Sequence, residues 1–270
     1  MFLYRLPLYI LPKTIKKGIL PFLNNRGLFS DKETLATYIG GKIYLDFKSS
    51  PIEMMKFLGL YERKKTKIFK KKIKPNMTVI DVGAHKGYFS FFTARLMKGT
   101  GKIYAIEPEP RNCFWIKKGI LANGYKNINI HRIALSNLNG KTLLYKGKKS
   151  GHHSIKRNMG LGSTVIETKK LDDLLNENNI QKLDFLKIDV EGAEVEVLEG
   201  AQHTLNQADL KITIDLHKRI DREKLYNILH SNNFRIYKFH KKKARIIDKE
   251  EFLSQNINEI YAEKSTHDRL

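Results

Sequence analysis

From residue 77 onward, short apolar runs alternate with longer amphipathic segments. Val79–Val82 and Ile103–Ile106 are apolar runs typical of strands in the middle of a sheet. Each is followed by a segment with apolar residues at helical spacing, Tyr88–Met97 and Pro110–Asn123, and both segments end near glycines. This alternation predicts an α/β fold with a mostly parallel sheet and helices on both faces.

The same pattern continues toward the C-terminus and then changes character. The pattern predicts strands at Ile128–Ile133, Leu183–Asp189 and Leu210–Leu216, a helix at Asp221–His230, and three closing antiparallel strands at Phe234–Phe239, Ala244–Ile247 and Ile257–Ala262. A length of 270 residues suits one such α/β domain with an N-terminal extension.

The N-terminal quarter divides into two predicted parts ahead of a main domain at residues 77–265. Residues 31–76 form a basic subdomain, with a strand pair at Tyr38–Phe47 that turns at Gly40-Gly41 and a basic helical segment up to Lys74. Residues 1–30 are apolar and basic. Prolines and Arg5 interrupt this segment, and it has no small-residue cleavage site, so we expect neither a membrane-spanning helix nor a signal peptide.

The charge of the chain suggests a partner, with two readings open. The formal net charge is +22, and residues 1–76 hold 17 Lys and Arg against 5 Asp and Glu. A basic face suits nucleic acid, anionic lipid headgroups or acidic glycans, whereas solvated lysines need no partner at all. The spacing of the lysines in segment 1–30 fits contact with a membrane interface or packing on the main domain. The single cysteine, Cys113, favours a structural thiol in a reducing compartment, so we expect a cytoplasmic protein, at most peripherally bound to a membrane.

The first strand leads into a glycine loop that suits a nucleoside without phosphates. Asp81 ends the apolar run, and Gly83, Ala84, His85 and Gly87 form the loop before the first helix. A dinucleotide loop has a glycine where this chain has His85, because the backbone must meet a pyrophosphate there. The loop therefore predicts S-adenosylmethionine, with free amides at the helix N-terminus and with Asp81 near the amino acid part or the loop amides.

Further site residues are expected at the carboxyl ends of the following strands. Glu107 ends the second strand and can accept hydrogen bonds from both ribose hydroxyls. The backbone of Ala134–Ser136 is placed to contact adenine, and Asp189 should share the crevice with Gly83 and Glu107. The polar segment 146–163 is predicted to be a mobile loop over the site. Its adjacent histidines, His152 and His153, point to opposite faces of a strand and do not suit one shared metal ion.

Together these motifs resemble the FkbM family of S-adenosylmethionine-dependent methyltransferases. The resemblance rests on Asp81-Val-Gly-Ala-x-x-Gly87, Glu107-Pro108, the block Asp184-Phe-Leu-Lys-Ile-Asp-Val-Glu-Gly-Ala-Glu194, and Gly200-Ala201, and it covers about residues 77 to 240. It implies a class I, Rossmann-like methyltransferase fold with a seven-stranded sheet whose last strand is reversed, and O-methylation of sugars, glycolipids or polyketide-like products. His85 departs from the asparagine usual in the family, and Asp215 matches its acid at the fifth strand. The cofactor residues then expected are Asp81, Gly83, Ala84, His85, Gly87, Glu107, Pro108, Ala134, Ser136 and Asp189.

A hydroxyl acceptor must lose its proton, so a base is needed. His217 is the first candidate and Asp189 the second, with Glu191 beside them. No resident metal is expected, although Asp189, Glu191 and His217 could alternatively hold a divalent cation that orients a diol. The acceptor is expected to be a hydroxylated small molecule, glycan or glycolipid.

Two other functions remain open at this stage. The basic surface suits an RNA methyltransferase, but the chain has no Asn/Asp-Pro-Pro-aromatic stretch, and Cys113 is misplaced as a nucleophile. A membrane- or polyanion-binding protein with a relic methyltransferase fold is the other alternative. The presence of Asp81, Glu107 and Asp189 argues against it.

Overall fold

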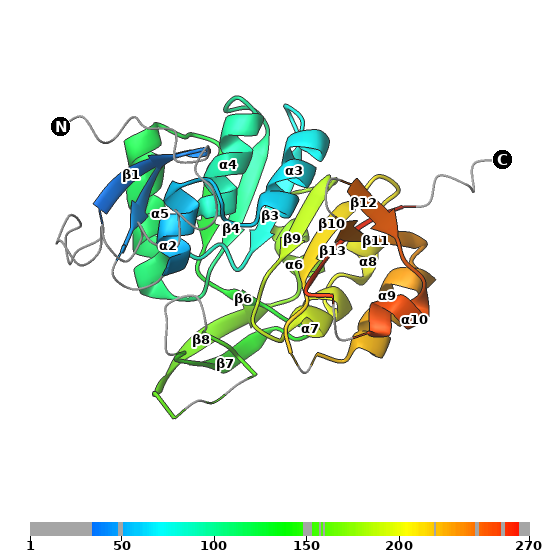
Figure 1. Cartoon of the computed structure of the whole chain (residues 1–270). Helices are drawn as coiled ribbons and strands as arrows, with labels where there is room; N and C mark the ends of the chain where they lie inside the picture. Colours follow the sequence, from blue (N-terminus) through cyan, green and yellow to red (C-terminus); the bar gives the residue numbers. More distant parts are fainter. Residues whose placement is uncertain are drawn as a thin grey trace.

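The computed structural model describes residues 34–47, 51–147, 153–156, 158, 160–218, 220–240, 243–254 and 257–264. The predicted segment 1–30, His152 and residue 265 lie outside the described residues. An eight-stranded sheet runs through the middle of the molecule in the order β12-β11-β13-β10-β9-β3-β4-β5 (Figure 1). Its strands are β3 (Thr78–Val82), β4 (Lys102–Ile106), β5 (Ile128–His131), β9 (Phe185–Ile188), β10 (Lys211–Asp215), β11 (Phe234–His240), β12 (Lys243–Ile246) and β13 (Glu259–Lys264).

The strand directions confirm the predicted class I α/β fold, and the sheet is mixed. Strands β5, β4, β3, β9 and β10 are parallel to one another, whereas β13 runs antiparallel between β10 and β11. The count of seven strands was wrong by one, because β12 folds back on β11 as a hairpin and adds an edge strand. The apolar run Ala244–Ile247, predicted as a strand, forms most of that addition.

Helices cover both faces of the sheet, since alternate strand residues point to opposite sides. Ile80 and Val82 of β3 belong to one core with α6 (Leu171–Glu177), α7 (Glu194–Glu199), α8 (Gln202–Leu205), α9 (Arg222–Ser231) and α10 (Lys249–Leu253). Val79 and Phe185 belong to the other core, with α3 (Arg63–Lys72) and α4 (Tyr88–Leu96). Helix α5 (Pro110–Asn123) has the predicted bounds. Within the described ranges, no helix is both long and apolar enough to cross a bilayer.

The predicted N-terminal strand pair forms a hairpin, β1 (Thr34–Tyr38) and β2 (Gly41–Leu45), followed by α2 (Pro51–Phe57). The turn needs glycines, because a Cβ on Gly40 would lie 2.1 Å from the Tyr38 hydroxyl and Gly41 has a φ of +112°. The Tyr38 hydroxyl donates to the Tyr88 carbonyl at 2.6 Å. Ile43 and Leu45 join the same core as α4, so the hairpin shares its apolar interior with the main sheet.

A small sheet projects from the carboxyl edge of the main one, at the bottom of Figure 1. It pairs β6 (Ala134–Leu135), β8 (Ser163–Lys169) and β7 (Gly140–Tyr145) in that order. Ala134, Leu144 and Ile166 form its own apolar cluster. Strands β7 and β8 flank the predicted mobile loop at residues 146–163. Of the described residues in that segment, Ser163 begins β8 and Ser154 forms an isolated bridge with Tyr145.

Candidate active site

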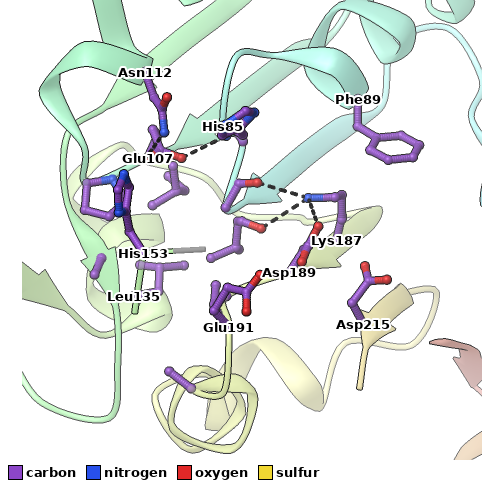
Figure 2. Close-up of a pocket in the computed structure, with 18 of the residues that line it drawn as sticks. His85, Phe89, Glu107, Asn112, Leu135, His153, Lys187, Asp189, Glu191 and Asp215 are labelled. Carbon is purple, nitrogen blue, oxygen red and sulfur yellow. Dashed lines mark hydrogen bonds and ion pairs between the residues drawn. The ribbon is translucent and has the colours of Figure 1, made fainter. Parts of the chain in front are cut away.

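A cavity of about 290 Å³ opens at the carboxyl ends of β3, β4, β9 and β10. This is the edge where open parallel sheets bind ligands, because the loops on neighbouring strands diverge there. Figure 2 shows two ends. Glu107, Asn112, Leu135 and His153 lie at one end, and Asp189, Glu191 and Asp215 lie at the other, where Lys187 is next to Asp189. We call these the nucleoside end and the acidic end.

The loop after β3 is held by the protein itself. Gly83 has a φ of +73°, and a Cβ there would lie 1.8 Å from the carbonyl oxygen of Asp189. The amides of Gly83 and Ala84 both donate to the Ile106 carbonyl, at 3.0 and 3.1 Å, and the His85 amide donates to Glu107. The end of β4 and Glu107 therefore already accept the hydrogen bonds of these three amides, and the free amides expected at the N-terminus of the helix are not among them.

Glu107 is a buried carboxylate at the nucleoside end. Its Oε2 accepts from the His85 amide at 2.8 Å, and its Oε1 accepts from the Glu109 amide and from Asn112 Nδ2 at 3.0 and 3.1 Å. Burial outweighs these hydrogen bonds and raises the pKa of Glu107 to about 7. Oε1 already accepts two hydrogen bonds and Oε2 accepts one, so the carboxylate can still accept a ligand hydroxyl at Oε2.

Cys113 lies behind this carboxylate on α5. Its thiol donates to the backbone oxygen of Glu107 at 3.0 Å. Burial and the nearby Glu107 charge raise the pKa of the Cys113 thiol to about 12, so it stays protonated at neutral pH.

A buried lysine links the two loops that face each other across the cavity. Lys187 of β9 places its Nζ 2.8 Å from Asp81 Oδ1, 3.8 Å from Asp189 Oδ2 and 3.2 Å from the Gly83 carbonyl. Burial opposes its charge, but Asp81 and Asp189 keep the pKa of Lys187 above its usual value. Asp81 also accepts from the Ser90 hydroxyl at 2.7 Å, so it supports the loop from behind.

His217 lies just beyond β10 with three carboxylates around its ring. Its Nδ1 is 2.5 Å from Glu194 Oε1, and its Nε2 is 3.5 Å from Glu191 Oε1 and 3.7 Å from Asp189 Oδ1. Burial alone would lower the pKa of His217, but hydrogen bonds to Glu191 and Glu194 raise that pKa to about 11. The imidazole is therefore protonated at neutral pH. The role of His217 as the catalytic base stays a prediction, and these surroundings argue against it because a protonated imidazole cannot accept a proton.

A second cluster of carboxylates, Glu62, Asp215 and Glu259, lies around Lys65 of α3 near the same end of the cavity. Lys65 is fully buried, pairs with Asp215 at the end of β10, and places its Nζ 2.5 Å from Glu62 Oε2. Glu62, Asp215 and Glu259 bring carboxylate oxygens within 4.8 Å of one another. Among the described residues, no other three potential metal ligands lie this close together. The alternative cation site at Asp189, Glu191 and His217 does not converge in this way. Between Glu62 and Asp215 the ammonium group of Lys65 already supplies the positive charge.

The structure brings most of the predicted site residues to one cavity. Those that line it are Gly83, Ala84, His85, Glu107, Pro108, Ala134, Asp189, Glu191 and His217. The cavity lining does not include Asp81, Gly87 or Ser136. Asp81 is 2% exposed behind the loop, and Gly87 packs so that a Cβ would lie 2.7 Å from the Phe91 ring. The Ser136 amide donates to the Lys169 carbonyl, so the predicted adenine contact at this amide is not available.

Several lining residues did not follow from sequence reasoning. The sequence did contain a signal for Lys187, because a lysine in the middle of an apolar parallel strand is buried and needs a buried partner of opposite charge. Asn112 follows Glu107 by five residues in the first turn of α5, where it can reach back to that carboxylate. Tyr61 and Glu62 come from the segment before α3, and no local pattern connects them to the site.

The family model of the methyltransferase FkbM domain matches residues 81–244. The chain belongs to the FkbM methyltransferase family. A similar curated protein is the 2-O-methyltransferase NoeI of Sinorhizobium fredii (strain NBRC 101917 / NGR234), 22% identical over 151 residues that cover 50% of this chain and 61% of NoeI. Another is the methyltransferase sdnD of Sordaria araneosa, 30% identical over 158 residues that cover 46% of this chain and 60% of sdnD.

The chain spans about three fifths of the length of these curated relatives. A crystal structure of an FkbM methyltransferase from Methylobacillus flagellatus KT matches with a TM-score of 0.51 at 15% sequence identity. That match covers 78% of this chain and 52% of the other, and it supports the fold. The match region begins at Asp81, so the hairpin, α2 and α3 lie outside it. Ile52 and Lys56 of α2, and Tyr61 and Glu62 just before α3, nevertheless line part of the cavity.

Proposed function

We propose that the protein is an S-adenosylmethionine-dependent O-methyltransferase that acts on a hydroxyl of a sugar, glycolipid or similar metabolite. Glu107 carries the cofactor part of the proposal. It is a buried carboxylate that lines the cavity at the carboxyl end of the strand next to the glycine loop. This position is the one from which an acid binds a ribose diol in Rossmann-like folds.

The residues present fit the parts of this cofactor. Glu107 can accept from a ribose hydroxyl at Oε2, and Ile133 and Leu135 add an apolar wall for adenine beside it. The acidic end, with Asp189 and Glu191, suits a positively charged sulfonium and ammonium. The amides of Gly83, Ala84 and His85 already donate to the end of β4 and to Glu107 and so are not free for a pyrophosphate, which supports a nucleoside ligand without one.

The bound cofactor would supply a methyl group on a positively charged sulfur, already activated for displacement. The contribution of the chain is mainly to hold the ligands in line, because alignment alone is worth several orders of magnitude in rate. Glu107 and Leu135 would orient the nucleoside, and the carboxylates of the acidic end would accept hydrogen bonds from acceptor hydroxyls. The name of the relative NoeI, a 2-O-methyltransferase, supports oxygen as the acceptor atom.

Isothermal titration calorimetry with S-adenosylmethionine tests the cofactor part. Wild-type protein is expected to bind, and Glu107→Ala is expected to weaken binding by about 30- to 150-fold, because a charge-assisted hydrogen bond to the ribose is lost. Glu167→Ala, which removes an exposed carboxylate of β8, serves as the matched control. No binding by the wild type, or equal binding by the Glu107 variant, would refute the proposal.

The raised pKa of Glu107 predicts a pH dependence of nucleoside binding. Only the ionised carboxylate offers a charged acceptor to a ribose hydroxyl, so the affinity for the nucleoside falls as the pH drops through about 7. Between pH 8 and pH 6 the association constant should fall about tenfold. 5′-Methylthioadenosine is the probe, because it has the ribose diol and lacks a titrating amine. A Glu107→Gln variant should give a flat profile, and an equally steep profile in that variant would rule out Glu107 as the titrating group.

A further inference from the structure

The acidic end of the cavity needs a group that can accept a proton, and His217 is poorly suited to that task. Three carboxylates surround its ring and keep it protonated. A protonated imidazole donates hydrogen bonds and has no free lone pair for an acceptor hydroxyl. Asp189 is no better, because Lys187, Lys65 and His217 outweigh its burial and lower its pKa. A carboxylate stabilised by these cations is a weak base.

Asp215 differs from both in its surroundings. It ends β10, next to the end of β9, and lines the same cavity as Asp189 (Figure 2). Its cation partner, Lys65, is shared with Glu62, and Glu259 of β13 brings a third carboxylate into the same group. One ammonium group therefore faces three carboxylates. Such a group holds one additional proton readily, because protonation relieves repulsion between like charges.

We propose that Asp215, positioned by Lys65 and Glu62, accepts the proton of the acceptor hydroxyl; this inference rests on the methyltransferase function proposed above. In the balanced step, the acceptor oxygen forms a bond to the methyl carbon as the carbon–sulfur bond breaks. The pair of electrons of that bond stays on sulfur, which becomes a neutral thioether. The hydroxyl proton moves to the Asp215 carboxylate, and it then passes to solvent.

The charged groups around Asp215 agree with this role. Lys65, Glu62 and Tyr61 face it from α3 and the turn before it, Asp189 faces it from the end of β9, and Glu259 belongs to β13. Burial, Asp189 and Glu62 outweigh Lys65 and raise the pKa of Asp215 to about 8. At neutral pH a group of this kind can both take up and release a proton, as general base catalysis requires.

The inference also gives the N-terminal extension a function. Lys65 and Glu62 lie outside the matched region that begins at Asp81, yet they hold a side chain at the end of β10. Lys65 is a positioning residue, since its buried ammonium binds Asp215 and does not itself line the cavity. The segment before α3 thus completes the acceptor side of the site, which the matched methyltransferase region forms only in part.

The first test observes the proton directly and needs no acceptor. In protein labelled with ¹³C at the aspartate side-chain carboxyls, one NMR resonance of the wild type is expected to titrate between pH 7 and 9. This titration should disappear in Asp215→Asn, and its midpoint pH should shift in Lys65→Met. The control variant Lys64→Met, which removes an exposed lysine next to Lys65 on α3, should leave the midpoint unchanged. If every aspartate of the wild type titrates below pH 6, the proposal is overturned.

The second test measures transfer of tritiated methyl from S-adenosylmethionine to a mixture of methyl glycosides as the probe. Asp215→Asn is expected to reduce the rate by 100-fold or more while the calorimetric affinity for S-adenosylmethionine stays within threefold. Lys65→Arg should restore most of the rate lost in Lys65→Met, and Lys65→Met should shift the pH profile. A rate within threefold of wild type in Asp215→Asn would refute the base assignment. If the wild type does not bind S-adenosylmethionine at all, the proposed function is refuted instead. The calorimetric result therefore distinguishes failure of the base assignment from failure of the proposed function.

Discussion

A Lys187→Met variant is expected to lose about 3–5 kcal/mol of unfolding free energy, the usual cost of removing one partner from a buried ion pair. Lys187 is 2% exposed and lies between Asp81 and Asp189, two of the carboxylates nearest the glycine loop. Methionine fills a similar volume but leaves both carboxylates without their cation. The substitution also removes the hydrogen bond that Lys187 Nζ donates to the Gly83 carbonyl.

Urea denaturation followed by circular dichroism measures this loss, with Lys182→Met as the matched control. Lys182 pairs with Asp184 at 3.0 Å, but 60% of its side chain is exposed, and surface pairs contribute at most about 1 kcal/mol. A deficit in Lys187→Met no larger than that of the control would contradict the assigned role of Lys187.

The deficit should also shrink in acid. In the wild type Lys187 holds the pKa of Asp189 below its usual value despite burial. That contribution to stability is present above the unfolded pKa of about 4 and is lost as the pH falls. In the variant Asp189 lacks this cation, so its protonation no longer removes that contribution to stability. The free-energy gap between wild type and variant is therefore expected to be smaller at pH 4 than at pH 7.

The sheet could be predicted because its signals are local. The apolar runs and helical spacing fixed the parallel strands, and the bounds of α5 agreed with its proline at the start and its Asn-Gly at the end. Glu107 followed from one rule about strand ends. The eighth strand was missed as part of the main sheet because a hairpin on an edge strand depends on tertiary packing, although its own sequence was correctly predicted to be extended.

The chemistry of the acidic end could not be predicted, because it depends on contacts between distant segments. His217 was a sensible base by residue type, but Glu191 and Glu194 around its ring change its protonation. Asp215 pairs with Lys65, a residue 150 positions away in the sequence. In the sequence, Lys65 belongs to a run of basic residues that indicates only a solvated helix. Only its burial on the inner face of α3 separates it from its exposed neighbours.

The net charge illustrates the same limit. The chain carries a formal charge of +22, which suggested anionic partners. Yet the acidic end of the cavity collects four carboxylates, those of Asp189, Glu191, Asp215 and Glu62. Basic residues of α3 such as Lys64, Lys67 and Lys70 are exposed and lie on the outside of the fold. The total charge thus describes the exposed surface and gives no indication of the carboxylates gathered in the cavity.

Gly83→Ala is expected to cost about 3 kcal/mol or more and to abolish detectable binding of S-adenosylmethionine, more than left-handed strain alone explains. The Cβ would lie 1.8 Å from the Asp189 carbonyl, which is backbone and cannot rotate away. The loops after β3 and β9 must therefore separate. The opening would move the amide of Asp189 from the Val82 carbonyl, 3.1 Å away, and so disturb both loops that line the cavity.

Gly99→Ala isolates the contribution of that close approach. Gly99 has a φ of +76°, nearly the same as the +73° of Gly83, but a Cβ there meets no atom within 4 Å. The control variant should lose only about 1 kcal/mol from backbone strain and should bind S-adenosylmethionine normally. Urea denaturation and calorimetry on both variants separate the cost of backbone strain from the cost of the close contact with the Asp189 carbonyl. Equal losses would mean that the loops after β3 and β9 yield easily, and the close contact between them would then have no part in shaping the site.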